Sequence, residues 1–112
     1  MAKIDKVNKL VEKGKTDKLL ALVYDKDKEV RLAAIKGLRS VPETEDSVNT
    51  LVAMINDTDT EIRKEVIISL GYTQDSYVET QLRHRLVAEN DDSVKAAIRE
   101  SLDRMRAAGV HD

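Results

Sequence analysis

The stretch DKDKEVRLAAIKGL (Asp25 to Leu38) recurs in similar form 32 residues later as DTDTEIRKEVIISL (Asp57 to Leu70). A third copy, ENDDSVKAAIRESL (Glu89 to Leu102), follows at the same step with more substitutions. A fixed period of roughly 20 to 50 residues is typical of stacked structural units, none of which can bury its apolar face alone. The sequence therefore predicts a protein built from three similar units.

Within one unit the apolar residues follow a helical period of about 3.6 residues. One stripe contains Val30, Ala34, Leu38 and Val41. Another apolar run precedes the acidic turn, at 19–23 in the first copy and at 51–55 in the second. Because the strand period of two is not seen, we interpret each unit as helix, short turn, helix.

This interpretation predicts an all-α chain with a single domain. We expect helices at about 2–13, 16–25, 28–40, 45–56, 59–71, 76–88 and 91–108. The units are expected to be a capping helix at 1–14, repeats at 15–44, 45–74 and 75–108, and a tail at 109–112. Gly14 and Gly109 stand where a left-handed residue would end a helix, and Val41-Pro42 separates the first two repeats.

The composition restricts the classes of function. The 112 residues carry a net charge of −2, so the chain lacks the positive field that favours nucleic acid. Cys is absent, which excludes disulfides and thiolate metal sites. The first ten residues interleave charged and apolar side chains, unlike a signal peptide, and no run is long enough to cross a membrane. We therefore expect a cytoplasmic protein that contacts no membrane.

The segment LLALVYDKDKEVRLAAIKGL (Leu19 to Leu38) resembles the HEAT repeat family, in a short-period form similar to the HEAT-like repeats of phycobilin lyase subunits. The resemblance extends over about residues 16–105. It implies a short right-handed α-solenoid of about three helical hairpins plus an N-terminal capping helix. Such repeats serve as adaptors, transport receptors, phosphatase scaffolds, lyase subunits and a few DNA repair enzymes, so the resemblance implies a scaffold whose activity lies on its surface.

The same resemblance implies a ladder of hydrogen bonds between neighbouring units. In the family, the first Asp of each turn and an Arg of the following helix form this ladder. The matching pairs are Asp25 with Arg31 and Asp57 with Arg63. The third copy carries Glu89 and Lys95 instead. Because Lys cannot form the bidentate fork of Arg, we expect the ladder to weaken at this end.

The alternating acids of each turn could instead suggest a calcium loop. Such a loop needs Gly at its sixth position and a bidentate Glu at its twelfth. Counting from Asp57, these positions hold Ile62 and Ile68, which cannot coordinate a cation. The turn acids Asp27, Asp59 and Asp91 each stand just before a helix, where a carboxylate accepts free backbone N–H groups. We therefore expect helix caps and no metal site.

No arrangement for catalysis is evident. The only histidines are His84, which lies between two arginines, and His111, which lies next to the C-terminus. Neither is paired with a nucleophile in a recognisable motif, and no phosphate-binding or dinucleotide pattern occurs. We expect no enzyme activity, no catalytic residue and no cofactor.

A nucleic-acid role has one argument in its favour. The predicted helix at 28–40 carries four cations, Lys28, Arg31, Lys36 and Arg39. Against it stand the net negative charge, the assignment of Arg31 to the ladder and the scarcity of aromatic residues, of which only three tyrosines are present. Nucleic acid is therefore not the expected partner.

The two ends of the predicted stack have polar outer faces. The first helix places Ile4, Val7, Leu10 and Val11 on one face and lysines around the other. In the last unit, Arg83-His84-Arg85 replace the apolar residues of the earlier units. We expect a whole small protein and a monomer. Residual apolar surface that could support a weak dimer would come from Met105, Ala107, Ala108 and Val110.

The predicted functional site lies on the second helix of each unit, which is expected to line a concave face. Helical angles place its residues away from the core stripe. The predicted partner-binding residues are Leu32, Lys36, Arg39, Lys64, Ile68 and Tyr72. Ile68 and Tyr72 would form an apolar centre flanked by cations, although Ile68 could equally pack against a neighbouring unit.

The expected function is a non-catalytic protein-binding module or adaptor. The apolar centre and its flanking cations suit an acidic-hydrophobic peptide or helix. The alternatives are an accessory subunit or enzyme resembling HEAT-like lyase subunits, and a nucleic-acid-binding HEAT-like protein.

Overall fold

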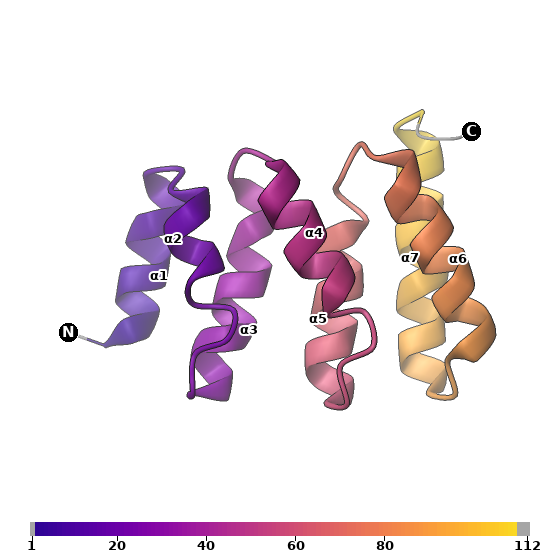
Figure 1. Ribbon diagram of the computed structural model, residues 1–112, viewed down its shortest axis with the longest axis horizontal. Coiled ribbons are helices and arrows are strands. Elements are labelled where there is room, and N and C mark those ends of the chain that lie inside the picture. Colours follow the sequence, from indigo (N-terminus) through magenta and orange to yellow (C-terminus); the bar gives the residue numbers. More distant parts are fainter. Residues whose placement is uncertain (1, 110–112) are drawn as a thin grey trace.

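The computed structural model describes residues 2–109, in which helices joined by turns are the only regular secondary structure (Figure 1). The α-helices are α1 (Lys3–Glu12), α2 (Thr16–Leu20), α3 (Lys28–Gly37), α4 (Glu45–Ala53), α5 (Thr60–Leu70), α6 (Ser76–Ala88) and α7 (Asp92–Ala107). A short 3-10 helix, η1 (Leu38–Ser40), continues α3. The predicted all-α class is confirmed.

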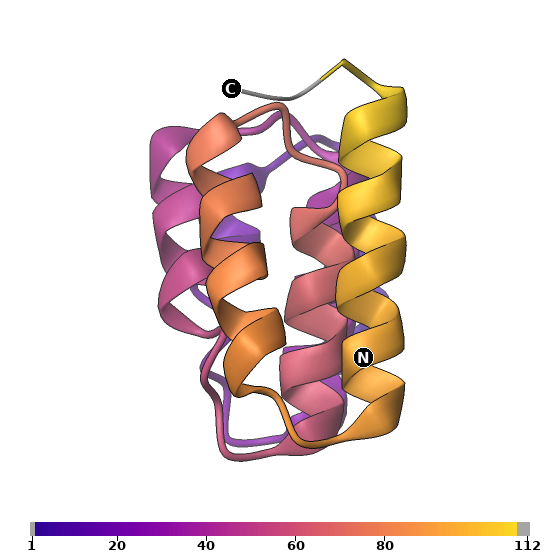
Figure 2. The same ribbon diagram turned by 90° about the vertical axis from the view of Figure 1, so that its right-hand side faces the viewer.

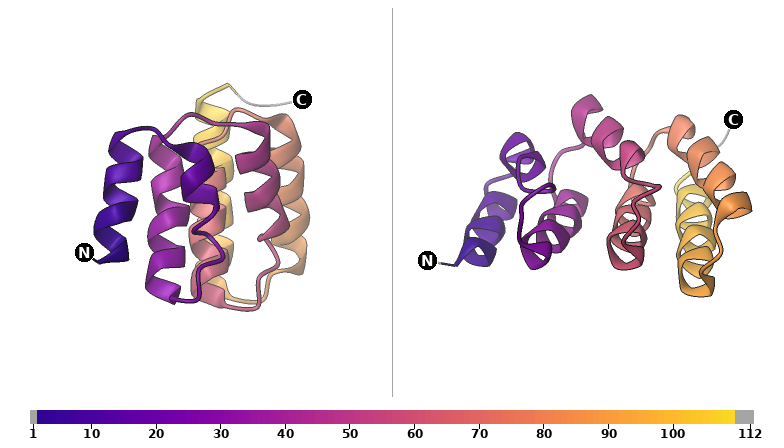
Figure 3. Two further views of the ribbon diagram at one scale, coloured as in Figure 1. Left: turned by 60° about the vertical axis from the view of Figure 1, so that its left-hand side comes forward. Right: turned by 60° about the horizontal axis from the view of Figure 1, so that its bottom comes forward.

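The helices are arranged in two layers that run along the molecule (Figures 1 and 2). We call α2, α4 and α6 the first-helix layer, and α1, α3, α5 and α7 the second-helix layer. Within the second-helix layer, α1 packs on α3, α3 on α5 and α5 on α7. Three hairpins, α2–α3, α4–α5 and α6–α7, therefore stack side by side behind α1, as the two further views in Figure 3 show. The predicted short α-solenoid is confirmed.

The repeat step of 32 residues places equivalent side chains in the core. Each unit contributes two fully buried positions from its second helix, which are one turn apart. These residues are Val30, Ala34, Ile62, Val66, Val94 and Ile98. Most of them belong to one continuous apolar cluster that crosses all three hairpins. Burial of apolar surface between units is therefore what holds the stack together.

The acids of the turns cap the following helices, as predicted. The carboxylate of Asp27 accepts the N–H of Glu29 at 2.9 Å. Asp59 and Asp91 each accept two N–H groups at the starts of α5 and α7. These bonds satisfy donors that a helix start leaves free. Gly14 and Gly109 have φ of +65° and +87°, which confirms the predicted left-handed helix ends.

The predicted ends of α2 and α4, the first helices of the first two units, were less accurate. Helices α2 and α4 stop at Leu20 and Ala53, and the chain then tightens into turns with bonds between residues three apart. These turns bury Val23 and Ile55. Helix α6 instead continues to Ala88, so Val87, the repeat equivalent of Ile55, is 91% exposed. The third unit therefore departs from the repeat register in its first helix.

Small residues line the contact between successive second helices. The hydroxyl of Ser69 on α5 donates to the carbonyl oxygen of Ile35 on α3 at 2.9 Å. Ser101 on α7 makes the equivalent bond to Ile67 on α5, also at 2.9 Å. At the third equivalent position, Gly37, an added Cβ would lie 2.7 Å from a methyl group of Val11. Positions 37, 69 and 101 therefore bring the second helices close together.

Within residues 2–109, the most deeply buried ion pair between units joins Arg63 to Glu89. The guanidinium donates to both carboxylate oxygens of Glu89, at 2.8 and 2.9 Å. Arg85 donates to the same carboxylate at 3.0 Å, and the N–H of Asp91 does so as well. Glu89 is only 3% exposed. The prediction that the ladder weakens at this end is therefore wrong, because Glu89 binds the Arg of the preceding unit and not Lys95.

The predicted pairs Asp25 with Arg31 and Asp57 with Arg63 are in contact, but differently from the prediction. Each Arg donates to the main-chain carbonyl of its Asp, at 2.9 and 2.8 Å, within the same unit. The carboxylate of Asp25 instead accepts from Lys3 of α1 at 3.0 Å. The carboxylates of these two residues therefore do not bind the predicted Arg partners.

The predicted dimer surface near the C-terminus also needs correction. Met105 is fully buried in the core, because the last turns of α7 pack against the rest of the stack. Ala107 and Ala108 are exposed, and Val110 lies outside the described residues. Met105 therefore offers no surface to a second copy.

The Glu89 contact yields a prediction for stability. Glu89→Ala would leave Arg63 partly buried without its carboxylate, so we expect a loss of about 3–5 kcal/mol in the free energy of unfolding. Asp57→Ala is the matched control, because its carboxylate accepts a single turn N–H, from Asp59. Its loss should be about 1 kcal/mol. Urea unfolding measures both, and equal losses would contradict the assignment of Glu89.

The same contact predicts a dependence on pH. The guanidinium of Arg63, helped by Asp91 N–H and Arg85, lowers the pKa of Glu89 from 4.5 to about 2. The contribution of Glu89 to stability should therefore be complete above pH 4.5 and be lost as the pH falls towards 2. The measurement is the difference in unfolding free energy between the native chain and Glu89→Gln across this range. A difference that stays constant down to about pH 2.5 would contradict the prediction.

Candidate functional site

The six predicted site residues lie on two neighbouring second helices and the turns that follow them. Leu32 and Lys36 belong to α3, and Arg39 belongs to η1. Lys64 and Ile68 belong to α5, and Tyr72 follows that helix directly. The repeat stacking brings α3 and α5 into contact, so the prediction selected one contiguous region of the molecule.

An open groove of about 480 Å³ runs along α3 between its neighbours in the second-helix layer. Two predicted residues, Leu32 and Lys36, line it. The other lining residues are Ile4 of α1, Glu29 and Ala33 of α3, and Glu65 of α5. Ile4 is 37% exposed, and Leu32 is half-buried with part of its side chain on the core. The groove therefore has an apolar floor formed by α1 and α3.

Sequence reasoning did not select Ile4 as a site residue. It placed Ile4 on the apolar face of the first helix, which was expected to cover the first unit. Val7 and Leu10 of that face are indeed buried. Ile4 lies in the first turn of α1 and remains 37% exposed. No signal in the sequence separates it from the buried members of the same face.

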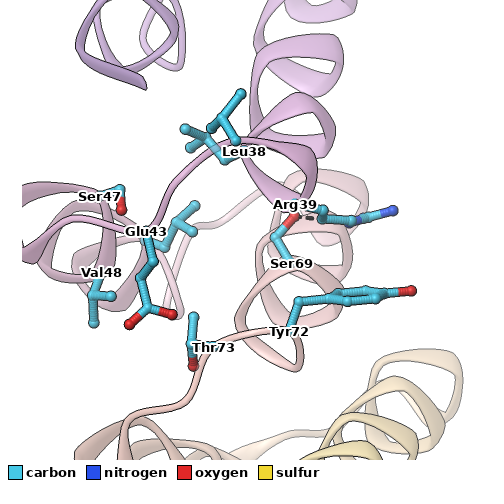
Figure 4. Close-up of a pocket in the computed structure, with 10 residues that line it drawn as sticks. Leu38, Arg39, Glu43, Ser47, Val48, Ser69, Tyr72 and Thr73 are labelled. Atoms are coloured by element: carbon cyan, nitrogen blue, oxygen red, sulfur yellow. Dashed lines mark hydrogen bonds between the residues drawn. The ribbon is translucent and has the colours of Figure 1, made fainter. Parts of the chain in front are cut away.

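Arg39 has a structural role that the sequence did not reveal. Its Nε donates to the hydroxyl of Ser69 at 2.9 Å (Figure 4). Its guanidinium also forms an ion pair with Glu65. Both partners belong to α5, in the next unit. The charge of Arg39 is therefore balanced by Glu65, and the Arg39 side chain links two units. The predicted free cation at this position is not present.

Ile68 and Tyr72, the predicted apolar centre, are both partly covered by other parts of the protein. Ile68 is half-buried and packs against the core cluster, which favours the alternative of packing against a neighbouring unit. Tyr72 is 46% exposed, and the guanidinium carbon of Arg104 on α7 lies 4.4 Å from its ring centre. This cation–π contact covers one face of the ring. In Figure 4 the ring extends in the same direction as Arg39, away from Val48 and Ser47.

The cations of this region differ in whether they are paired. Lys28 binds the carboxylates of Asp59 and Glu61 at 2.9 and 3.0 Å, and these contacts raise the pKa of Lys28 and contribute to lowering that of Asp59. Within residues 2–109, Lys36 and Lys64 form no ion pair. These two lysines are therefore the cations that remain available to a partner.

The other features of the described residues do not suggest catalysis. The cavity in Figure 4 is about 50 Å³ and is lined by Leu38, Val48 and Thr73 among others, which leaves room for water but not for a substrate. No group of three or more His, Asp or Glu side chains in residues 2–109 is placed to hold a metal ion. His84 is exposed. The lowered carboxylate pKa values arise from caps and ion pairs.

No helix within residues 2–109 combines the length and the apolar character that crossing a bilayer requires.

The architecture defines an α-solenoid of helical hairpins. The family model for HEAT repeats matches residues 16–103, which is most of the chain. The chain therefore belongs to the HEAT repeat family. No curated protein and no solved structure matches it significantly. The narrower resemblance to phycobilin lyase subunits is not supported by these comparisons and stays a prediction.

The contacts of Arg39 yield a testable prediction. Arg39→Ala should lower the free energy of unfolding by about 1–3 kcal/mol, because it removes the bonds to Ser69 and Glu65 between two units. Lys36→Ala is the control, since this residue lies one turn earlier and is exposed and unpaired in the described residues. Its effect should stay within about 0.5 kcal/mol. Thermal and urea unfolding would measure both, and a neutral Arg39→Ala would refute the structural role.

Proposed function

We propose that this protein is a non-catalytic interaction module that binds a partner protein on its second-helix layer. The observation that carries the proposal is the open groove along α3, with its apolar floor of Ile4, Leu32 and Ala33. Repeats of the HEAT family commonly mediate contacts between proteins and generally act as non-catalytic scaffolds. The groove supplies a concave, partly apolar surface of the kind that peptide segments occupy.

The charges around the groove suggest how a ligand is oriented. Glu29 lies one turn before Leu32 on α3, and Lys36 lies one turn after it. Glu65 is held by Arg39, so its charge is compensated. Lys36 therefore attracts carboxylates at one end of the groove, while Glu29 repels them at the other. An acidic-hydrophobic peptide or helix fits this arrangement, with its acidic residues towards Lys36.

The apolar part of the proposed interface lies nearer to the N-terminus than the sequence suggested. Ile4 and Leu32 supply exposed apolar area, whereas Ile68 is used mainly in packing and Tyr72 is covered on one face. Lys64 stays in the proposed site as an unpaired cation. That the module is a monomer and that it acts in the cytoplasm both remain predictions.

The test uses two variants in the groove and two matched controls outside it. Ile4→Asp and Lys36→Glu alter the apolar floor and the cationic end. Val87→Asp places the same acid on an exposed apolar residue of α6, and Lys26→Glu reverses an exposed lysine in a turn. Each folded variant is immobilised and used to recover partners from a lysate of the source cell. We expect at least a tenfold loss of the main protein partner, about 1.4 kcal/mol, for the groove variants only.

Other results would reject the proposal. Unchanged capture by folded Ile4→Asp and Lys36→Glu would exclude this groove as the binding site. Recovery of nucleic acid with a steep dependence on salt would favour the nucleic-acid alternative. A catalytic activity of the purified chain would favour the enzyme alternative.

A further inference from the structure

Within residues 2–109, the N-terminal hairpin position of the stack contains α1 alone. Each of α3, α5 and α7 is preceded by a helix of the first-helix layer, and the members of that layer pack on one another from α2 to α4 to α6. Helix α1 belongs to the second-helix layer, but in the described residues 2–109 no first-layer helix precedes it (Figures 1 and 3). The side of α2 that faces away from α4 is therefore not covered by a first-layer helix.

A groove of about 270 Å³ lies at this end, between α1 and α2. It is lined by Lys6, Leu10, Lys18, Ala21 and Leu22. Leu22 is half-buried and packs against the core, and Ala21 is exposed. The groove thus has an apolar floor with a lysine on each helix.

Two contacts show which residues of α1 correspond to those of the later second helices. Gly37 lies against Val11 of α1, just as Ser69 bonds to Arg39 in the preceding unit. Lys3 of α1 pairs with the turn acid Asp25, just as Arg63 of α5 pairs with the turn acid Glu89. Because Ser69 is the repeat equivalent of Gly37, Val11 of α1 corresponds to Arg39. Because Arg63 is the repeat equivalent of Arg31, Lys3 corresponds to Arg31. Both pairs give a step of 28 residues between α1 and the first repeat.

At this step Lys6 is equivalent to Ala34, and further on to Val66 and Ile98. These three residues are fully buried, whereas Lys6 is exposed. The position that is covered in every complete hairpin is therefore open in α1 and carries a charged residue.

We propose that the groove between α1 and α2 binds an amphipathic helix of a partner protein, which extends the first-helix layer and places acidic residues against Lys6 and Lys18. The bound helix would occupy the place that α2, α4 and α6 hold in front of the following second helices. This site is at the end of the stack and is independent of the groove along α3.

The acidic character of the partner helix follows from the charges of this end. Residues 1–40 contain eleven Lys and Arg but only six Asp and Glu, although the whole chain has a net charge of −2. Lys6 and Lys18 form no ion pair within residues 2–109, and no acid lines the groove. Two unpaired cations beside an apolar floor favour a helix with carboxylates flanking an apolar stripe.

The chain itself supplies a probe of suitable shape and charge. Residues 43–56, ETEDSVNTLVAMIN, contain α4, which packs in the first-helix layer of this protein. The segment has three acids before its apolar stripe and no basic residue. A peptide of this sequence with blocked ends, titrated into the full-length protein, reports on the groove without knowledge of the natural partner.

The experiment follows the backbone amide signals of the ¹⁵N-labelled protein by NMR. We expect saturable shifts confined to α1, α2 and residues 21–22, which follow α2 and line the groove. Lys6→Glu and Lys18→Glu should each weaken binding by about fivefold or more, near 1 kcal/mol, as for an ion pair with favourable geometry. Lys26→Glu is the matched control, because it changes the net charge equally at an exposed residue outside the groove. It should change the dissociation constant less than twofold.

Several outcomes would overturn the proposal. One is the absence of saturation at millimolar peptide, and another is the appearance of the main shifts on α6 and α7. Equal weakening by Lys26→Glu would show attraction to net charge alone. Concentration-dependent self-association that Lys6→Glu abolishes, seen by sedimentation without peptide, would mean that a second copy occupies the groove. Each outcome is independent of the variants at Ile4 and Lys36, so the two sites can fail separately.

Discussion

The spacing between successive second helices is the constraint on which the stack depends. Small residues occupy positions 37, 69 and 101, where each helix meets the one before it, and at Gly37 even an added Cβ would lie 2.7 Å from Val11. Ser69 and Ser101 also donate to a carbonyl oxygen across the contact, so the close approach leaves no buried hydroxyl unsatisfied. Because this spacing between second helices recurs in each unit, it also sets the distance between the acidic turns of neighbouring units. At this spacing the guanidinium of Arg63 reaches the carboxylate of Glu89 in the next turn.

Features that depend on local sequence were predicted well. The repeat step and the helical stripe identified the hairpins, because core positions such as Ala34 and Val66 recur at one spacing. The caps at Asp59 and Asp91 were also predicted correctly, since a carboxylate before a helix bonds to N–H groups two and three residues away. Nothing beyond the turn itself is needed for these contacts to form.

Features that depend on distances between units were not predicted. Glu89 was expected to be the weak member of the ladder because of Lys95, but its partner is Arg63 of the preceding unit. The extra methylene of Glu relative to Asp lets its carboxylate reach this guanidinium while it still accepts the N–H of Asp91. Arg39 was expected to be free because helical angles place it away from the core stripe. Its side chain is long enough to reach Ser69 and Glu65 on the next helix, which helical angles within α3 cannot reveal.

On this surface the paired cations stabilise the fold, whereas the unpaired cations are available to a ligand. Arg63 and Arg39 are held by carboxylates between units, where their charges are partly shielded from water and their bonds contribute to stability. Lys6, Lys18, Lys36 and Lys64 have no such partner within residues 2–109, so each could pair with a ligand without breaking an internal contact. The first three of these line the two grooves beside α1. Within residues 2–109, helix α1 has a neighbour on only one side in its layer, so a ligand in either groove adds contacts on its uncovered side. By mass action, binding at either site would therefore stabilise the N-terminal end of the stack against local unfolding.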